Sequence, residues 1–125
     1  MRILLLLPLL FAASTPAAQT DWVHAPRVEI RLASFDYDPE TIRLRAGQPV
    51  VLHLVNTGGG GHNFSAPQFF AAANVATGSI RDGAVEVPGR QAVDIRLVPA
   101  RGRFRLRCTH TFHTTLGMRG TILVE

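Results

Sequence analysis

The chain has 125 residues, which is room for one domain. It has thirteen basic side chains, all of them arginine, and nine acidic side chains of Asp and Glu. The balance is only mildly basic, and the arginines alternate along apparent strands, as on a solvated face, instead of clustering with aromatic residues. Composition therefore argues against nucleic acid as a partner.

Residues 1–18 have the organisation of a secretory signal peptide. Arg2 precedes an apolar run at 3–13, and small residues follow at 14–18, where a signal peptidase would cleave. The alternative, an uncleaved anchor, is disfavoured because a membrane-spanning helix needs roughly 20 apolar residues. We expect cleavage after Ala17 or Ala18, no membrane anchor, and a mature domain of residues 19–125 in the periplasm.

Beyond the signal, short runs of alternating apolar and polar residues, separated by Gly, Pro and Asp, predict antiparallel strands. The predicted strands span residues 28–32, 42–45, 50–55, 93–97, 102–108 and 120–125. The third of these is apolar on both faces apart from His53, which is typical of a strand at the centre of a sheet.

Residues 67–75 break the alternation with Phe69, Phe70 and several alanines, and predict a short helix or an irregular insertion. Seven or eight strands with one such insertion predict an all-β fold, a Greek-key β-sandwich.

The only cysteine, Cys108, and the only methionine beyond the start residue, Met118, flank His113 at the spacing C-x4-H-x4-M. Thiolate, imidazole and thioether form a soft ligand set that suits copper in both oxidation states. His62, which follows four consecutive glycines, is the candidate for a fourth ligand. Metal ligation would also explain how a lone thiol stays reduced in an oxidising compartment.

Strand parity indicates where the thiol points. Cys108 shares its parity with Phe104 and Leu106, so it should face into the sandwich where the strand ends. The loop that follows is held at both ends by strands and can bring His113 and Met118 over the thiol. Copper there would have two imidazoles and a thiolate in a plane, with a long axial thioether.

Four segments together resemble the cupredoxin family, the blue copper proteins of the plastocyanin and azurin type. They are AGQPVVL at 46–52, NTG at 56–58, HNF at 62–64, and C-x4-H-x3-GM-x-GT from Cys108. The resemblance extends from about Arg27 to the end of the chain and keeps the order and spacing of the ligands.

This resemblance implies a cupredoxin-like sandwich that binds one copper ion. It implies that the Asn63 side chain bonds near Thr109 and ties the two ligand loops together. It also implies that the Gly61 carbonyl lies near the metal, opposite the axial ligand. The implied copper ligands are His62, Cys108, His113 and Met118.

Each of these residues has an alternative role. Cys108 could be a small buried hydrophobe and Met118 could fill the core. His110 competes with His113 for the equatorial position, because a strand that continued past Cys108 would direct His110 inward too. Chain length between the ligands favours His113.

The leading functional hypothesis is one-electron transfer between Cu(I) and Cu(II), without enzyme activity, since four protein ligands leave no open position for Lewis-acid chemistry. Electrons would pass through the exposed edge of His113, within an apolar patch of Phe112, Leu116 and either Pro67 or Phe69. Such a patch suits brief docking with a redox partner protein, and we expect a monomer.

Two other hypotheses remain open. A periplasmic copper carrier, store or sensor could use the same ligands, and the flexible approach at 58–61 favours it mildly. An enzyme related to copper oxidases or nitrite reductases would need a second copper centre or an open site, and the remaining histidines form no clustered motif. They are His24, expected in a loose N-terminal arm, His53, expected to be a strand histidine with a hydrogen-bond partner, and His110.

Overall fold

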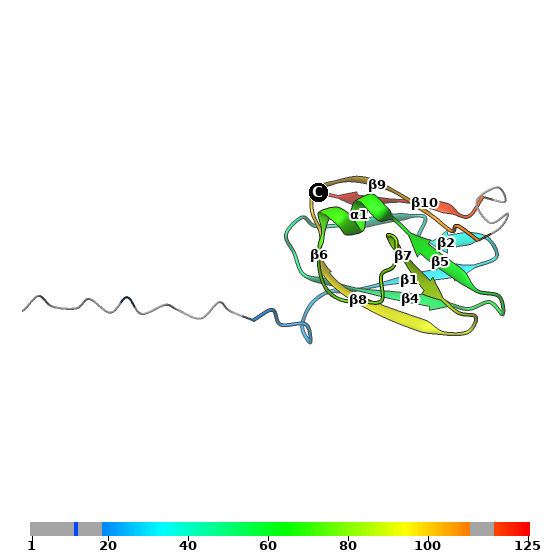
Figure 1. The fold of residues 1–125 in the computed structure, drawn as a ribbon, viewed down its shortest axis with the longest axis horizontal. Coiled ribbons are helices and arrows are strands. Elements are labelled where there is room, and N and C mark those ends of the chain that lie inside the picture. The colour runs from blue at the N-terminus through cyan, green and yellow to red at the C-terminus, as the bar shows by residue number, and fades with distance from the viewer. Residues whose placement is uncertain (1–11, 13–18, 111–116) are drawn as a thin grey trace, which may run out of the picture.

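The computed structural model describes residue 12, residues 19–110 and residues 117–125, and these fold into ten strands and one helix (Figure 1). In chain order the elements are β1 (Arg27–Ala33), β2 (Asp36–Asp38), β3 (Thr41–Leu44), β4 (Val50–Asn56), β5 (His62–Ser65), α1 (Pro67–Ala72), β6 (Asn74–Thr77), β7 (Ala84–Val87), β8 (Ala92–Val98), β9 (Gly102–Arg107) and β10 (Arg119–Val124). In this part of the chain, no helix is long and apolar enough to cross a membrane.

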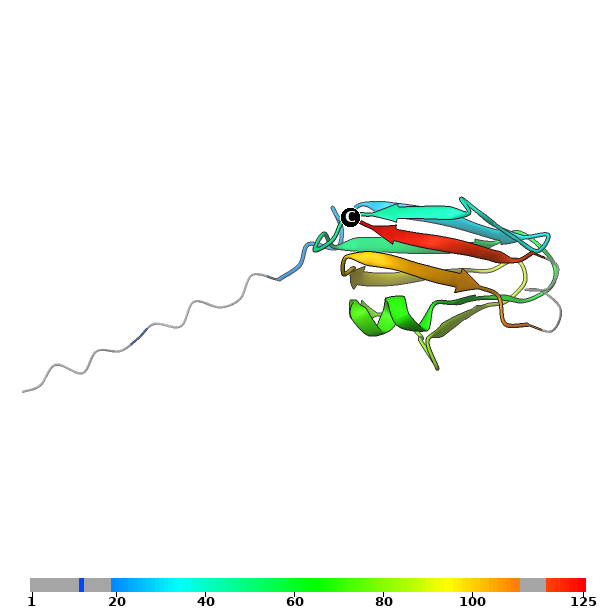
Figure 2. The ribbon, with the colours of Figure 1, turned by 90° about the horizontal axis from the view of Figure 1, so that it is seen from above.

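The strands form two five-stranded sheets that pack face to face (Figures 1 and 2). The first sheet has the order β2-β1-β4-β8-β6, and the second has the order β3-β10-β9-β5-β7. The prediction of an all-β Greek-key sandwich with one short helix is confirmed, as is the central place of β4 in its sheet.

Two strand pairs are parallel, β1 with β4 and β3 with β10. The prediction of antiparallel strands was therefore wrong at these two pairs. The physical reason is that the chain crosses from the first sheet to the second between β2 and β3, so neighbours in a sheet are not always consecutive in sequence. Strand alternation reports which face is buried and says nothing about strand direction.

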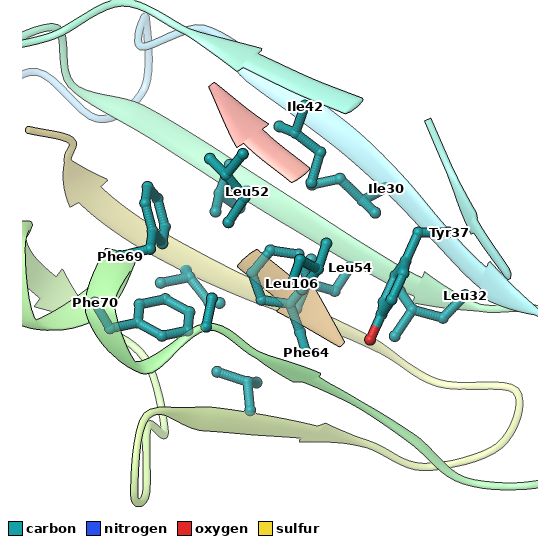
Figure 3. Close-up of a cluster of buried hydrophobic side chains, with 14 of the residues drawn as sticks. Ile30, Leu32, Tyr37, Ile42, Leu52, Leu54, Phe64, Phe69, Phe70 and Leu106 are labelled. Atoms are coloured by element: carbon teal, nitrogen blue, oxygen red, sulfur yellow. The ribbon is translucent and has the colours of Figure 1, made fainter. Parts of the chain in front are cut away.

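The core lies between the sheets and is filled by the inward-facing residues of the long strands (Figure 3). Ile30 of β1, Leu52 of β4 and Leu106 of β9 are among the side chains that meet there, each almost fully buried. Burying side chains of this size contributes roughly 1.5–3 kcal/mol each, so these strands hold the sandwich together.

The helix α1 adds aromatic side chains to this core. Phe69 packs edge-on against Phe70 and Phe104, with ring centroids 5.3 and 5.6 Å apart. Phe104 lies near the start of β9, whereas Cys108 follows the end of that strand. The helix therefore supports one end of β9, and the predicted ligand follows the other.

Candidate metal site

Three of the four predicted ligands lie at the ends of neighbouring strands. His62 begins β5, Cys108 directly follows β9, and Met118 directly precedes β10. Because β9 and β10 are antiparallel with Arg107 opposite Arg119, the residues just beyond this pair are also adjacent. The Cys108 N–H accordingly donates to the Met118 carbonyl at 3.1 Å.

All three side chains are withdrawn from solvent. Cys108 and Met118 have 0% of their surface exposed and His62 has 7%. This confirms the inward direction that strand parity predicts for Cys108. The fourth predicted ligand, His113, lies outside the described residues.

The sulfur of Cys108 accepts a hydrogen bond from the Asn63 backbone N–H at 3.4 Å. An N–H aimed at sulfur stabilises negative charge on it and fixes its direction, as outer-shell bonds do at metal sites. Because Asn63 follows His62 in β5, the same bond brings the thiol next to the strand that carries the histidine.

The Asn63 side chain ties the two ligand segments together, as the resemblance implies. Its Oδ1 accepts from the Thr109 N–H at 2.9 Å, and its Nδ2 donates to Thr109 Oγ1 at 2.7 Å. Nδ2 also donates to Glu86 Oε1 on β7 at 3.0 Å. Since Asn63 is buried, these bonds satisfy polar atoms that would otherwise be costly in the core.

Tyr37 on β2 supports the same strand from the other sheet, a role that was not predicted from the sequence. Its hydroxyl donates to the Asn63 carbonyl at 2.6 Å. Burial raises the pKa of Tyr37 well above its ordinary value, and the negative charge of a Cys108 thiolate raises it further. The phenol therefore stays protonated as a donor. The only sequence signal was a tyrosine between two aspartates.

Hydrogen bonds restrain the glycine run before His62. Asn56 Nδ2 donates to the Gly60 carbonyl at 2.8 Å and Asn56 Oδ1 accepts from the Gly58 N–H at 3.0 Å. The Arg90 N–H donates to the Gly58 carbonyl at 2.9 Å. A Cβ added to Gly89 would lie 2.1 Å from the Gly59 carbonyl oxygen. The segment that contains Gly89 therefore approaches the glycine run more closely than any residue with a side chain would allow. The position of the Gly61 carbonyl near the metal stays a prediction.

The other histidines of the described residues lie in polar contacts. His110 Nε2 is 2.8 Å from Glu86 Oε2, and His24 Nδ1 is 2.6 Å from Asp21 Oδ2. His53 Nδ1 is 2.5 Å from Asp94 Oδ1, which confirms it as a strand histidine with a partner. Within residues 19–110 and 117–125, no three His, Cys, Asp or Glu side chains gather as a metal site. Of the four predicted ligands, only His62 and Cys108 are both of these residue types and within the described residues.

The apolar patch predicted around His113 needs correction at Phe69. This side chain is fully buried in the core, because α1 presents it to Phe104, so it cannot contribute to a docking surface. Phe112 and Leu116 lie outside the described residues. Phe35 is instead exposed beside the site, with its ring 6.4 Å from that of His62 in an edge-on contact.

The donor set fits copper better than a hard cation. A thiol and a thioether are soft ligands, and imidazole suits copper, whereas calcium and magnesium take oxygen ligands. Cys108 and Met118 belong to one buried apolar cluster, which would exclude water from an ion held there. The residues that would hold it are His62, Cys108 and Met118, together with His113.

A sequence profile of the cupredoxin-like domain matches residues 2–124, so the chain belongs to the cupredoxin-like domain family. A search of curated proteins found no match.

Solved structures with this fold include two auracyanins and a multicopper oxidase. Auracyanin B is 21% identical with a TM-score of 0.61, covering 91% of this chain and 93% of its own. Auracyanin A, a blue copper protein from the green thermophilic photosynthetic bacterium Chloroflexus aurantiacus, is 19% identical with a TM-score of 0.58, covering 79% and 98%. The multicopper oxidase McoA from the hyperthermophile Aquifex aeolicus is 17% identical with a TM-score of 0.65, covering 89% of this chain but 32% of the oxidase. At these identities the likeness shows the fold alone.

Proposed function

We propose that this chain is an exported mononuclear type 1 (blue) copper protein that transfers single electrons. One copper ion would be held by His62, Cys108, His113 and Met118, and when bound it would supply a one-electron couple between Cu(I) and Cu(II). Family membership and the fold shared with auracyanin A, a blue copper protein, support this proposal.

The observation that carries the proposal is the position of Cys108. Its thiol is fully buried, accepts an N–H bond from Asn63, and lies in the chain segment bonded to Met118. A cysteine that served only as a small hydrophobe would need neither a donor aimed at its sulfur nor a thioether residue bonded alongside.

The chain's own residues would supply a preset geometry. Asn63 holds Thr109 and the sulfur of Cys108 in place through hydrogen bonds. The Tyr37 hydroxyl in turn holds the Asn63 carbonyl, and Asn56 holds the glycine run before His62. Since supporting bonds of this kind orient ligands, little should rearrange when the charge of the site changes. This arrangement supports electron transfer.

The restrained glycine run also bears on the copper carrier, store or sensor hypothesis. That reading draws on a flexible approach to His62, whereas the Asn56 and Arg90 bonds hold the run at Gly58 and Gly60. An electron carrier is therefore the better supported role. An enzyme role is less supported, since the proposed ligands fill the site. The multicopper oxidase shares this fold over only 32% of its own length.

Export forms part of the proposal. Residues 1–18 would be removed as a signal peptide, leaving residues 19–125 as a periplasmic domain. An oxidising compartment is compatible with a single cysteine if that cysteine ligates a metal.

The decisive experiment is the absorption spectrum of the purified protein with added Cu(II). We expect an intense visible thiolate-to-copper band that disappears in Cys108→Ala and persists in His53→Ala, a matched control in the Arg27 and Asp94 cluster. A colourless copper complex, or a colour that survives Cys108→Ala, would contradict the blue copper assignment.

A second measurement separates the two copper roles. An electron carrier should retain copper against a competing chelator in both oxidation states, and Met118→Leu should shift its reduction potential while copper stays bound. Loss of copper from Met118→Leu would favour the metal-transfer role instead.

A further inference from the structure

The outer face of the second sheet carries five exposed arginines, which we call the arginine face. Three alternate along β9, one begins β10 and one lies on β3 (Figure 2 shows these strands side by side). They are Arg43, Arg103, Arg105, Arg107 and Arg119. Alternation alone puts the β9 arginines on one face, because their inward neighbour Leu106 fills the core.

Carboxylates do not balance this charge. Each of the nine acidic residues lies in the part of the chain that the structure describes. On this face Glu86 is already bonded to Asn63 and His110, and Glu125 lies 3.9 Å from Arg43. In residues 19–110 and 117–125, no ion pair forms at the four remaining arginines of the face.

On the outer face of the first sheet, by contrast, two arginines form ion pairs with carboxylates of the same sheet. Arg27 pairs with Asp94 at 3.1 Å, and Arg31 pairs with Glu29 at 2.9 Å. The first sheet therefore neutralises these two arginines within the fold. The second sheet leaves most of its arginines to solvent.

The register makes the arginine face costly by itself. Arg107 lies directly opposite Arg119 across the β9 and β10 pair, and like charges in that position destabilise an antiparallel sheet. A bound anionic group would relieve this repulsion. The charge arrangement therefore favours the state in which an anionic group is bound to this face over the unbound state.

The arginine face is also hollowed, beside the start of α1. A hollow of about 660 Å³ is lined by Arg105, Arg107 and Arg119 together with Ser65 and Gln68. A second hollow, on the side of β7, shares Arg107 and Ser65 with the first and also contains Arg81, Asp82 and Glu86, so the first hollow is the more cationic of the two. Guanidinium groups bind carboxylates with two parallel hydrogen bonds, and the hydroxyl and amide groups add further donors.

We propose that the arginine face binds a partner protein through a surface rich in Asp and Glu. A lipid surface is less suited, because membrane-surface binding also needs apolar side chains to insert. In the described residues the exposed large apolar side chains are Val23 and Phe35, and neither lies on a strand of the second sheet.

This surface adjoins the candidate metal site. Arg107 directly precedes Cys108, and Arg119 directly follows Met118. A partner bound there would therefore lie against the ends of the strands that carry these ligands. That the partner exchanges electrons with this protein rests on the proposed function, whereas the binding of an acidic surface does not.

The test uses fluorescein-labelled poly-L-glutamate as the probe, with the purified protein in low salt and without added copper, and follows fluorescence anisotropy. The variant Arg105→Gln/Arg107→Gln is compared with Arg31→Gln/Arg96→Gln, which removes the same charge from exposed positions on the first sheet. We expect roughly tenfold weaker binding for the first variant and a change of less than about twofold for the control. Equal weakening in both would mean that net charge alone attracts the probe, and would overturn the proposal.

Two further measurements keep the proposal falsifiable if a variant folds poorly. In the unaltered protein, amide NMR shifts caused by the probe should concentrate on β9 and β10, and shifts spread over both sheets would contradict the proposal. Vesicles containing phosphatidylglycerol should bind more weakly than poly-L-glutamate at equal charge, and the reverse order would assign the face to a membrane. Because copper is absent throughout, failure here and failure of the colour test are independent.

Discussion

The two ends of the sandwich bury different chemistry. Around α1 the core is aromatic, with Phe69 packed against Phe70 and Phe104. Toward the ligand end it is polar and sulfur-containing. In the described residues, the buried polar side chains are Asn56 at the end of β4, His62 and Asn63 at the start of β5, and Ser65 at the end of β5.

Buried polar groups cost free energy unless they are hydrogen-bonded, so a stretch of them is tolerated only with partners or for function. Every buried side-chain nitrogen or oxygen in the described part of the chain has a partner. The aromatic end therefore supplies stability, whereas the ligand end is organised to hold groups in fixed positions. Substitutions at the two ends should therefore fail in different ways.

The largest effect is expected at the aromatic end. Phe69→Ala removes a fully buried ring and should lower the free energy of unfolding by about 3–5 kcal/mol, measured by urea denaturation. The copper colour of the folded fraction should stay unchanged. The control is Phe35→Ala, whose ring is 39% exposed and should matter much less. A loss below about 1 kcal/mol for Phe69→Ala would mean that α1 is not part of the stabilising core.

A smaller effect on stability, but a larger one on the site, is expected at Asn63. Asn63→Ala removes the bonds to Thr109 and leaves buried polar groups without partners, at a cost of about 1–3 kcal/mol. The loop that carries Cys108 should then lose its fixed position, so the copper spectrum should broaden or weaken. Asn74→Ala, at an exposed position of β6, is the matched control. An unchanged spectrum would show that the tie is dispensable.

The fold was predictable where strands are long. The strands β1 and β8 have seven residues each, and alternation marks their buried face clearly, whereas β4 is marked by an apolar run on both faces. The strands β2, β5, β6 and β7 have only three or four residues, and β5 is buried at every position, so no alternation is visible. The predicted count of seven or eight strands was therefore too low.

The candidate site was predictable as a set of ligands but not as a supported structure. The spacing of Cys108 and Met118 follows from two paired strands and their loop, which is a local relation. The contacts of Asn63 with Tyr37 and with Thr109 span 26 and 46 residues, and only tertiary folding brings them together. The resemblance implied the second contact, whereas a tyrosine between two aspartates does not by itself predict the first.

Substitutions of His110 and His113 test which of these two histidines is the copper ligand. His110 lies against Glu86, so His110→Ala should leave the copper colour nearly unchanged and alter stability by less than about 1 kcal/mol, since the Glu86 side chain of that pair is 65% exposed. His113→Ala should change the spectrum and open the site to added imidazole. Absorption spectra of both variants, with and without imidazole, decide the question. If the two variants behave in the reverse way, His110 is the ligand and β9 effectively continues past Cys108.

The smallest effect is expected on the outer face of the first sheet, away from both ends. Slight burial raises the pKa of Asp94, but hydrogen bonds from His53 and Arg27 lower it by more, so the net shift is downward. A lowered carboxyl pKa stabilises the fold above the unfolded-state value near pH 4 and loses that contribution as pH falls through the native value. Because Asp94 is well exposed, Asp94→Asn should cost less than about 1 kcal/mol at pH 7. Thermal unfolding of both proteins should then converge at pH 2, and a gap as wide there as at pH 7 would show that the cluster acts through packing instead of charge.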